Sequence, residues 1–162
     1  MKISYNNNFT LNLGDAKADH SVVVFANLGC PWCRRWYVNN LNQLTRSVSE
    51  HKLSAHLKFL NKPKQPLHNG NLANSFVDYS NPNEALRYVK SVYDHQAVLD
   101  QLGSDERVIN FLETTFNVQN QIPKKNQNAI VKEAKINRVK SVPTIFFDGI
   151  KHADSGWNLP EM

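Results

Sequence analysis

The chain has 162 residues, of which 41% are hydrophobic and 20% charged, so it is long enough for one domain with a sizeable core. Only two cysteines are present, which excludes a fold held together by several disulfides. The N-terminus lacks the apolar core of a signal peptide, and no apolar run could span a bilayer, so we expect a cytoplasmic protein without a membrane partner. The net charge of +5 comes from scattered lysines without a nucleic-acid-binding motif, and we expect no nucleic-acid partner.

The first third of the chain predicts a strand followed directly by a helix. Residues 3–13 alternate loosely and suggest a strand or small hairpin at a sheet edge. Residues 20–26 include a short apolar run with β-branched residues at its centre, which is typical of a buried strand. The motif Cys30-Pro31-Trp32-Cys33 follows at once, and its Pro31 suits the first position of a helix. Apolar residues then recur at helical spacing to about Glu50: Tyr37, Leu41, Leu44 and Val48.

A helix N-terminus is a favourable place for a reactive cysteine. The thiolate is the reactive form, and the free N–H groups and dipole at the start of a helix stabilise negative charge. We therefore expect a lowered pKa for Cys30, with its sulfur open to solvent. Cys33 lies one turn further on the same side, where a shielded sulfur can reach that of Cys30. One exposed attacking sulfur and one shielded resolving sulfur are what disulfide exchange requires.

Half of a zinc site and a pair of core residues are the two other interpretations of these cysteines. A zinc site needs two further ligands, and the chain has no third cysteine. The histidines include no pair at the usual ligand spacing: His20, His51, His56, His68, His95 and His152. The pattern therefore favours redox chemistry, and we expect no metal and no cofactor.

The middle of the chain predicts one more strand and then a helical block. Residues 53–60 are predicted to form a strand parallel to that of residues 20–26, so that the two strands and the helix between them make a βαβ unit. Helical periodicity then runs from residue 67 to residue 140. Within it, Asn81 is a candidate helix cap, Gly103-Ser104 separates two helices, and a last helix covers about residues 124–137.

The C-terminal region returns to strand character. Residues 141–147 predict a strand, Asp148-Gly149 a two-residue hairpin turn, and residues 150–152 the start of the return strand. The remaining tail is too short for a full closing helix.

This order of elements resembles the thioredoxin superfamily, and the long helical block resembles its DsbA-like branch. Two motifs carry the resemblance, which covers nearly the whole chain: Cys30-Pro31-Trp32-Cys33 at a helix start, and Val142-Pro143-Thr144 before a late strand. It implies an α/β, thioredoxin-like fold with a helical insertion. Residues 1–65 and 139–162 would form the thioredoxin-like domain, and residues 66–138 an inserted helical subdomain.

The resemblance also implies roles for the residues of both motifs. Cys30 would be the nucleophile and Cys33 the resolving thiol. Pro143 would be a cis-proline facing the pair, and its turn would bring the Val142 backbone beside Cys30 to pair with an extended substrate strand. Taken alone, Pro143 could instead be a trans proline that opens an edge strand. Substrate binding would use the residues around the cysteines: Pro31, Trp32, Val142, Pro143 and Thr144.

The chain departs from the family pattern near the motif. Many relatives carry a buried carboxylate in the strand before it, which helps to move protons during exchange, whereas this strand offers Val22, Val23 and Val24. The dipeptide Pro31-Trp32 has no positive charge, so we expect weaker thiolate stabilisation than a histidine would give. Trp32 could offer an apolar contact to a peptide or pack on its own helix.

We therefore predict a thiol–disulfide oxidoreductase, of disulfide reductase, oxidase or isomerase type, that exchanges disulfides with protein or peptide substrates. A redox partner or a glutathione-like thiol would restore the cysteine pair. The lack of a signal segment favours reduction or redox sensing. One alternative is a redox-sensing adaptor that binds a partner protein without turnover. A less favoured one is a glutathione-using transferase or isomerase, because such sites usually lack the second cysteine.

Overall fold

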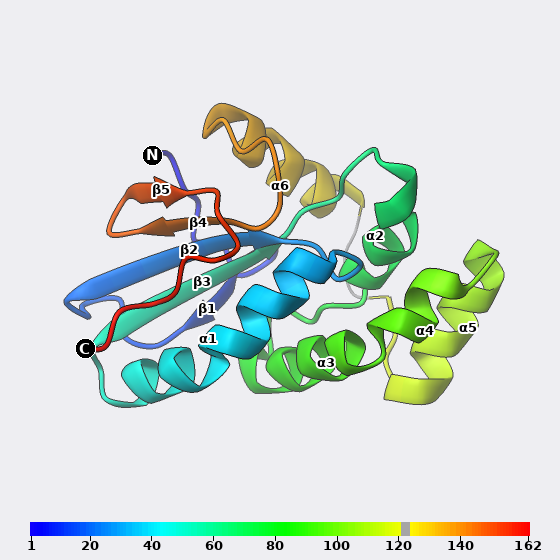
Figure 1. The fold of residues 1–162 in the computed structure, drawn as a ribbon, viewed down its shortest axis with the longest axis horizontal. Coiled ribbons are helices and arrows are strands. Elements are labelled where there is room, and N and C mark those ends of the chain that lie inside the picture. The colour runs from blue at the N-terminus through cyan, green and yellow to red at the C-terminus, as the bar shows by residue number, and fades with distance from the viewer. Residues whose placement is uncertain (121–123) are drawn as a thin grey trace.

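Five strands form one mixed sheet in the computed structural model, which describes residues 1–120 and 124–162 (Figure 1). Their order across the sheet is β1-β3-β2-β4-β5, and β2 and β3 are parallel while the other neighbouring pairs are antiparallel. The bounds of the strands are β1 (Leu11–Leu13), β2 (His20–Ala26), β3 (Leu53–Phe59), β4 (Thr144–Phe147) and β5 (Ile150–His152). The predicted α/β fold, with late strands beside the first parallel pair, is confirmed.

Helices follow β2 and fill the chain between β3 and β4. α1 (Pro31–Ser49) joins β2 to β3, which confirms the predicted βαβ unit. The described helices of the predicted helical block are η1 (Gln65–Leu67), α2 (His68–Asn74), α3 (Pro82–Asp94), α4 (Gln96–Gln101), α5 (Asp105–Phe116) and α6 (Lys124–Ile136). Figure 1 shows α1 and α3 on one side of the sheet and α6 on the other. The division into two subdomains stays a prediction.

β2 lies at the centre of the sheet, with helices on both of its faces (Figure 1). Val22, Val24 and Phe25 are at most 1% exposed, because a central strand covered on both sides has no solvent face. Since the carboxyl ends of parallel strands lie at one edge of a sheet, the segments that follow β2 and β3 come together there. The backbone N–H of Leu60 donates to the Ala26 carbonyl across this edge at 2.7 Å. The N-terminus of α1 lies at the same edge.

Three local features differ from the sequence predictions. At the N-terminus only β1 pairs with the sheet, because the preceding residues form a turn in which the Phe9 N–H donates to the Asn6 carbonyl. Asn81 stands at the N-cap of α3, but its side chain makes no capping hydrogen bond. The helix that was expected to continue to Gly103 is interrupted at His95, whose backbone leaves helical geometry between α3 and α4.

The tail after β5 contains no helix or strand in residues 153–162, as its length predicted. Asn40 of α1 holds it in place. The amide nitrogen of Asn40 donates to Asn158 Oδ1 at 3.1 Å, and its Oδ1 accepts from the Leu159 N–H at 2.8 Å. Within the part of the chain that the structure describes, no helix combines the length and apolar character that crossing a membrane requires.

Candidate active site

A short loop at the centre of the sheet edge connects β2 to α1 and presents the cysteines. Asn27, which is fully buried, organises this loop. Its Oδ1 accepts a hydrogen bond from the Gly29 N–H at 2.8 Å, and its amide nitrogen donates to the Leu60 carbonyl at 2.9 Å. The Cys30 N–H donates to the Asn27 carbonyl at 3.1 Å. The chain therefore enters α1 through a turn whose backbone groups are already paired.

Two helices of the helical block hold the same loop from outside the sheet. The Leu28 N–H donates to Asn74 Oδ1 of α2 at 3.1 Å, and the Leu28 carbonyl accepts from Gln96 Nε2 of α4 at 2.9 Å. Both of these polar side chains are buried. The sequence analysis missed them, because single polar residues far from the motif leave no periodic signal. They make the helical block part of the scaffold of the cysteine loop.

The two cysteines lie at the first turn of α1, as the sequence predicted. Cys30 is the N-cap, and its Sγ accepts a hydrogen bond from the Cys33 N–H at 3.4 Å. Cys30 Sγ also lies 3.6 Å from the Val142 carbonyl oxygen. The expectation of an open Cys30 sulfur is wrong, because Cys30 is only 4% exposed and Cys33 1% exposed. The Val142 carbonyl lies against the sulfur and covers part of it.

The environments of the two thiols shift their pKa values in opposite directions. A hydrogen bond from the Cys33 thiol is the main cause that lowers the pKa of Cys30 to about 7, and the backbone N–H groups of Cys33 and Trp32 add to it. Burial and the carboxylate of Asp100 oppose this shift. Burial, followed by the neighbouring Cys30, raises the pKa of Cys33 well above its usual value. Near neutral pH, a large fraction of Cys30 is therefore ionised, while Cys33 keeps its proton.

Asp100 is a second feature that the sequence analysis missed. It lies on α4, one helical turn after Gln96, which itself bonds to the cysteine loop. Partial burial raises the pKa of Asp100 to about 6. Asp100 lies far from the motif along the chain, so no local sequence pattern links it to Cys30.

The loop before β4 faces Cys30 and contributes to a groove beside it. The Val142–Pro143 peptide bond is cis. Together with Trp32 and residues 153–155, Val142 and Pro143 line a groove of about 230 Å³. Thr144 is not part of this groove: its side chain is 1% exposed, and its Oγ1 donates to the Ser141 carbonyl at 2.6 Å.

Pro31 and the second side of Trp32 line another groove, along the exposed face of α1. Trp32 is 56% exposed, so its ring stands on the surface and does not pack into the core. Of the residues predicted to bind substrate, the structure therefore brings Trp32, Val142 and Pro143 together and places Pro31 next to them. Among residues 1–120 and 124–162, no three histidine, cysteine or carboxylate side chains gather as metal ligands.

A central strand, a tight loop, two cysteines in the first turn of a helix and a cis-proline loop against them define a thioredoxin-type site. Comparison with known families agrees: the sequence model of a family described as thioredoxin matches residues 6–158. The chain therefore belongs to this thioredoxin family, which confirms the predicted resemblance. No curated protein sequence is significantly similar to the chain.

Solved structures share the fold over most of its length. A conserved protein of unknown function from Enterococcus faecalis is 27% identical, with a TM-score of 0.88 over 94% of this chain and 86% of its own. A putative protein-disulfide isomerase from Pseudomonas syringae is 15% identical, with a TM-score of 0.72 over 90% and 91% of the two chains. Wolbachia pipientis α-DsbA1 is 16% identical, with a TM-score of 0.67 over 90% and 83%. The DsbA-like form of the thioredoxin fold is thus shown.

Proposed function

We propose that the protein is a thiol–disulfide oxidoreductase that exchanges disulfides with protein or peptide substrates through Cys30 and Cys33. The observation that carries this proposal is the placement of both thiols in the first turn of α1, where Cys30 Sγ accepts from the Cys33 N–H at 3.4 Å and lies 3.6 Å from the Val142 carbonyl oxygen. These surroundings shift the two pKa values in opposite directions. One sulfur is prepared to attack and the other to wait in its protonated form. The names of the structural neighbours, which include disulfide isomerases and DsbA proteins, support the same class.

The proposed reaction has two exchanges of sulfur bonds. The Cys30 thiolate attacks one sulfur of a substrate disulfide, a mixed disulfide forms, and the departing substrate thiolate takes up a proton. Cys33 then releases its proton and attacks Cys30, so that the Cys30–Cys33 disulfide forms and the substrate leaves as a dithiol. Two electrons pass from the pair to the substrate; Cys33 supplies one of the two protons that the substrate thiols take up, and solvent supplies the other. A glutathione-like thiol or a redox partner returns the electrons, and an oxidised pair runs the steps in reverse.

The groove beside Cys30 suits an extended substrate segment. Trp32 offers an aromatic surface, and the backbone of Val142 lies next to the attacking sulfur. A segment that pairs with this backbone would carry its own sulfur to Cys30. A cytoplasmic location, where the pair would rest reduced and act as a reductant, belongs to the same proposal. Equilibration with glutathione buffers measures the reduction potential that decides the direction.

Serine variants of the two cysteines test the proposal in an insulin-disulfide reduction assay. Cys30→Ser should abolish reduction, because no thiolate remains at the helix N-terminus. Cys33→Ser should still attack but accumulate the mixed disulfide, which intact-protein mass spectrometry detects. Thermal unfolding of both variants controls for folding. Full activity of Cys30→Ser would overturn the proposal, and stoichiometric binding without turnover by the unmodified protein would favour the redox-sensing adaptor instead.

A further inference from the structure

Two arginines line the exposed face of α1 directly after Cys33. Arg34 and Arg35 form, with Pro31, Trp32, Val38 and Asn39, a groove of about 390 Å³ that contains no carboxylate. Trp32 and Val38 are 56% and 55% exposed, so apolar surface and positive charge lie together here. We call this groove the arginine groove.

Within residues 1–120 and 124–162, the contacts of both arginines include no carboxylate that would neutralise their positive charges. The Arg34 Nε donates to the Tyr93 carbonyl at 2.9 Å, which fixes the side chain without neutralising it. The Arg35 guanidinium lies 6.0 Å from the centre of the Trp32 ring, a cation–π arrangement that holds it beside the exposed indole. Among the ion pairs formed by residues 1–120 and 124–162, none includes Arg34 or Arg35.

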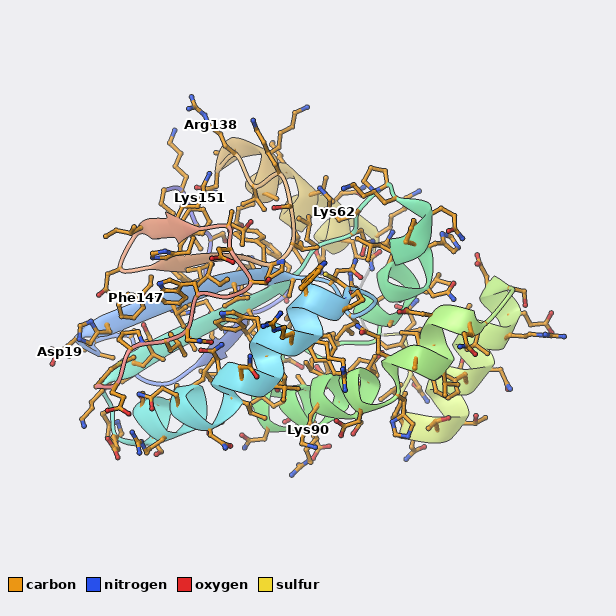
Figure 2. The ribbon with its side chains drawn as sticks, in the orientation of Figure 1. Asp19, Lys62, Lys90, Arg138, Phe147 and Lys151 are labelled. Atoms are coloured by element: carbon orange, nitrogen blue, oxygen red, sulfur yellow. The ribbon has the colours of Figure 1, made fainter. Side chains whose placement is uncertain are left out.

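Lysines add positive charge at the same edge of the sheet. The Lys62 ammonium donates to the carbonyl of Lys140, two residues before Val142, at 2.9 Å. The backbone N–H of Lys62 donates to Asn71 Oδ1, which also accepts from the amide of Asn27 in the cysteine loop. Burial and the nearby Lys64 ammonium lower the pKa of Lys62. Figure 2 shows Lys62 beside the end of the sheet at which α1 begins.

The groove on the other side of Trp32 contains a negatively charged side chain instead of positively charged ones. Asp154 lines the groove that contains Val142 and Pro143, and its Oδ1 accepts from the Gly156 N–H at 2.8 Å. Trp32 thus separates the arginine groove from a groove with a carboxylate. Because exposed charges of one sign attract and orient partners of the other sign, the two grooves would attract oppositely charged segments.

On the basis of the proposed oxidoreductase function, we infer that the preferred substrates are polypeptide disulfides with acidic residues on one flank of the reactive cysteine, which bind in the arginine groove. A carboxylate there would meet two cations that form no ion pair within the part of the chain that the structure describes, and the neighbouring Trp32 and Val38 would cover its apolar stem. A lysine at the same place would meet only like charge. A purely apolar segment would form no ion pair with either guanidinium group.

Two sets of three synthetic peptides test this inference. Each contains one disulfide and differs only in the flanking residues, which are glutamate, glutamine or lysine, placed before the cysteine in one set and after it in another. We expect kcat/KM for reduction to be highest with glutamate on one of the two flanks and lowest with lysine, by on the order of five-fold for contacts that are exposed to solvent. The preference should shrink at 1 M salt, where screening is strong.

Arg35→Glu should reverse the order of the glutamate and lysine peptides, because it replaces the cation nearest to Trp32. Lys17→Glu, in the exposed loop between β1 and β2, is the matched control, since it changes the net charge by the same amount away from the site. The control should keep the order of the unmodified protein. Equal changes in both variants would show a general effect of charge and would overturn the inference.

The small neutral disulfide bis(2-hydroxyethyl) disulfide separates this inference from the function on which it rests. Reaction with this compound and with all peptides at equal rates would leave an oxidoreductase without the proposed selectivity. Failure to react with any disulfide would overturn the proposed function itself. Preference for the lysine peptides would overturn the inference alone.

Discussion

Cys30 and Cys33 stand three residues apart, yet their surroundings give them opposite tendencies to lose a proton. The dipeptide between them carries no positive charge, so the hydrogen bonds of the first helical turn supply the stabilisation of the Cys30 thiolate. Burial raises the pKa of Cys33, so the Cys33 thiol keeps its proton. In the proposed exchange reaction, this geometry would give Cys30 the charge that a nucleophile needs and Cys33 the proton that a resolving thiol keeps until the second step.

The rate of Cys30 alkylation should follow this shift in pKa. Only the thiolate reacts, so the rate with iodoacetamide should rise as pH increases through about 7 and level off above it. At one pH unit below the midpoint we expect about a tenth of the maximal rate. In Cys33→Ala the midpoint should move to higher pH, because the main hydrogen bond to the thiolate is lost. A midpoint that remained at the usual cysteine value in the unmodified protein would contradict the proposed activation.

The negative charge of Asp100, in the helical block, raises the pKa of Cys30 and so destabilises its thiolate. Asp100→Asn should lower the pKa of Cys30 and raise its alkylation rate at pH 6.5 by on the order of two-fold, because a like charge is removed. The difference should fade at pH 5, where the carboxyl with a pKa of about 6 is already protonated. Asp94→Asn is the matched control: Asp94 forms an exposed ion pair with Lys90 and is not among the groups that act on Cys30. Equal effects of both variants would exclude a specific role for Asp100.

Local sequence patterns were sufficient for the elements that carry the cysteines. The apolar run of β2 and the periodicity of α1 are properties of adjacent residues, and so is the turn at Asp148-Gly149, where both residues adopt positive φ. The positions of Asn74 and Gln96 at the cysteine loop could not be predicted in this way. Each contact joins residues more than 40 positions apart through a single polar side chain. Such contacts depend on how the helices pack, which no local pattern contains.

The packing of α2 against the cysteine loop depends on a close approach of two glycines. A Cβ on Gly70 would overlap with Asn27 Oδ1 and with the backbone nitrogen of Gly29. Gly70→Ala should therefore displace α2 from the loop and lower the free energy of unfolding by about 1–3 kcal/mol. Urea denaturation measures this change, and the Cys30 alkylation profile should shift as well, because the loop carries Cys30.

Gly103→Ala provides the control for this prediction. A Cβ at Gly103, between α4 and α5, meets no atom within 4 Å and its backbone needs no positive φ. This variant should unfold at nearly the same urea concentration as the unmodified protein. If Gly70→Ala were equally harmless, the contact between α2 and the cysteine loop would not determine the site.

A buried ionic cluster lies on the face of the sheet that α6 covers, opposite the face that α1 covers. Phe25 and Lys58 are neighbours on adjacent strands, and the Lys58 ammonium reaches toward α6 and the N-terminal segment. It donates to Thr10 Oγ1 at 2.6 Å and to the Ser4 carbonyl at 2.7 Å, and lies 3.1 Å from the Glu133 carboxylate. One ammonium thus connects β3, α6 and the N-terminus. This cluster contributes to the fold without contacting the cysteines.

Replacing only Lys58 of the Lys58–Glu133 ion pair should lower the free energy of unfolding much more than replacing both residues. Lys58→Met leaves the Glu133 carboxylate buried without its partner, and we expect the free energy of unfolding to fall by about 3–5 kcal/mol. The double variant Lys58→Met with Glu133→Leu should recover a large part of this loss, because no unpaired charge remains. Lys90→Met, which breaks an exposed pair with Asp94, should change stability by less than about 0.5 kcal/mol. Urea denaturation measures the free energy of unfolding of all three variants. If the double variant were no more stable than Lys58→Met, the loss of stability would come from the other hydrogen bonds of Lys58 and not from the burial of an unpaired carboxylate.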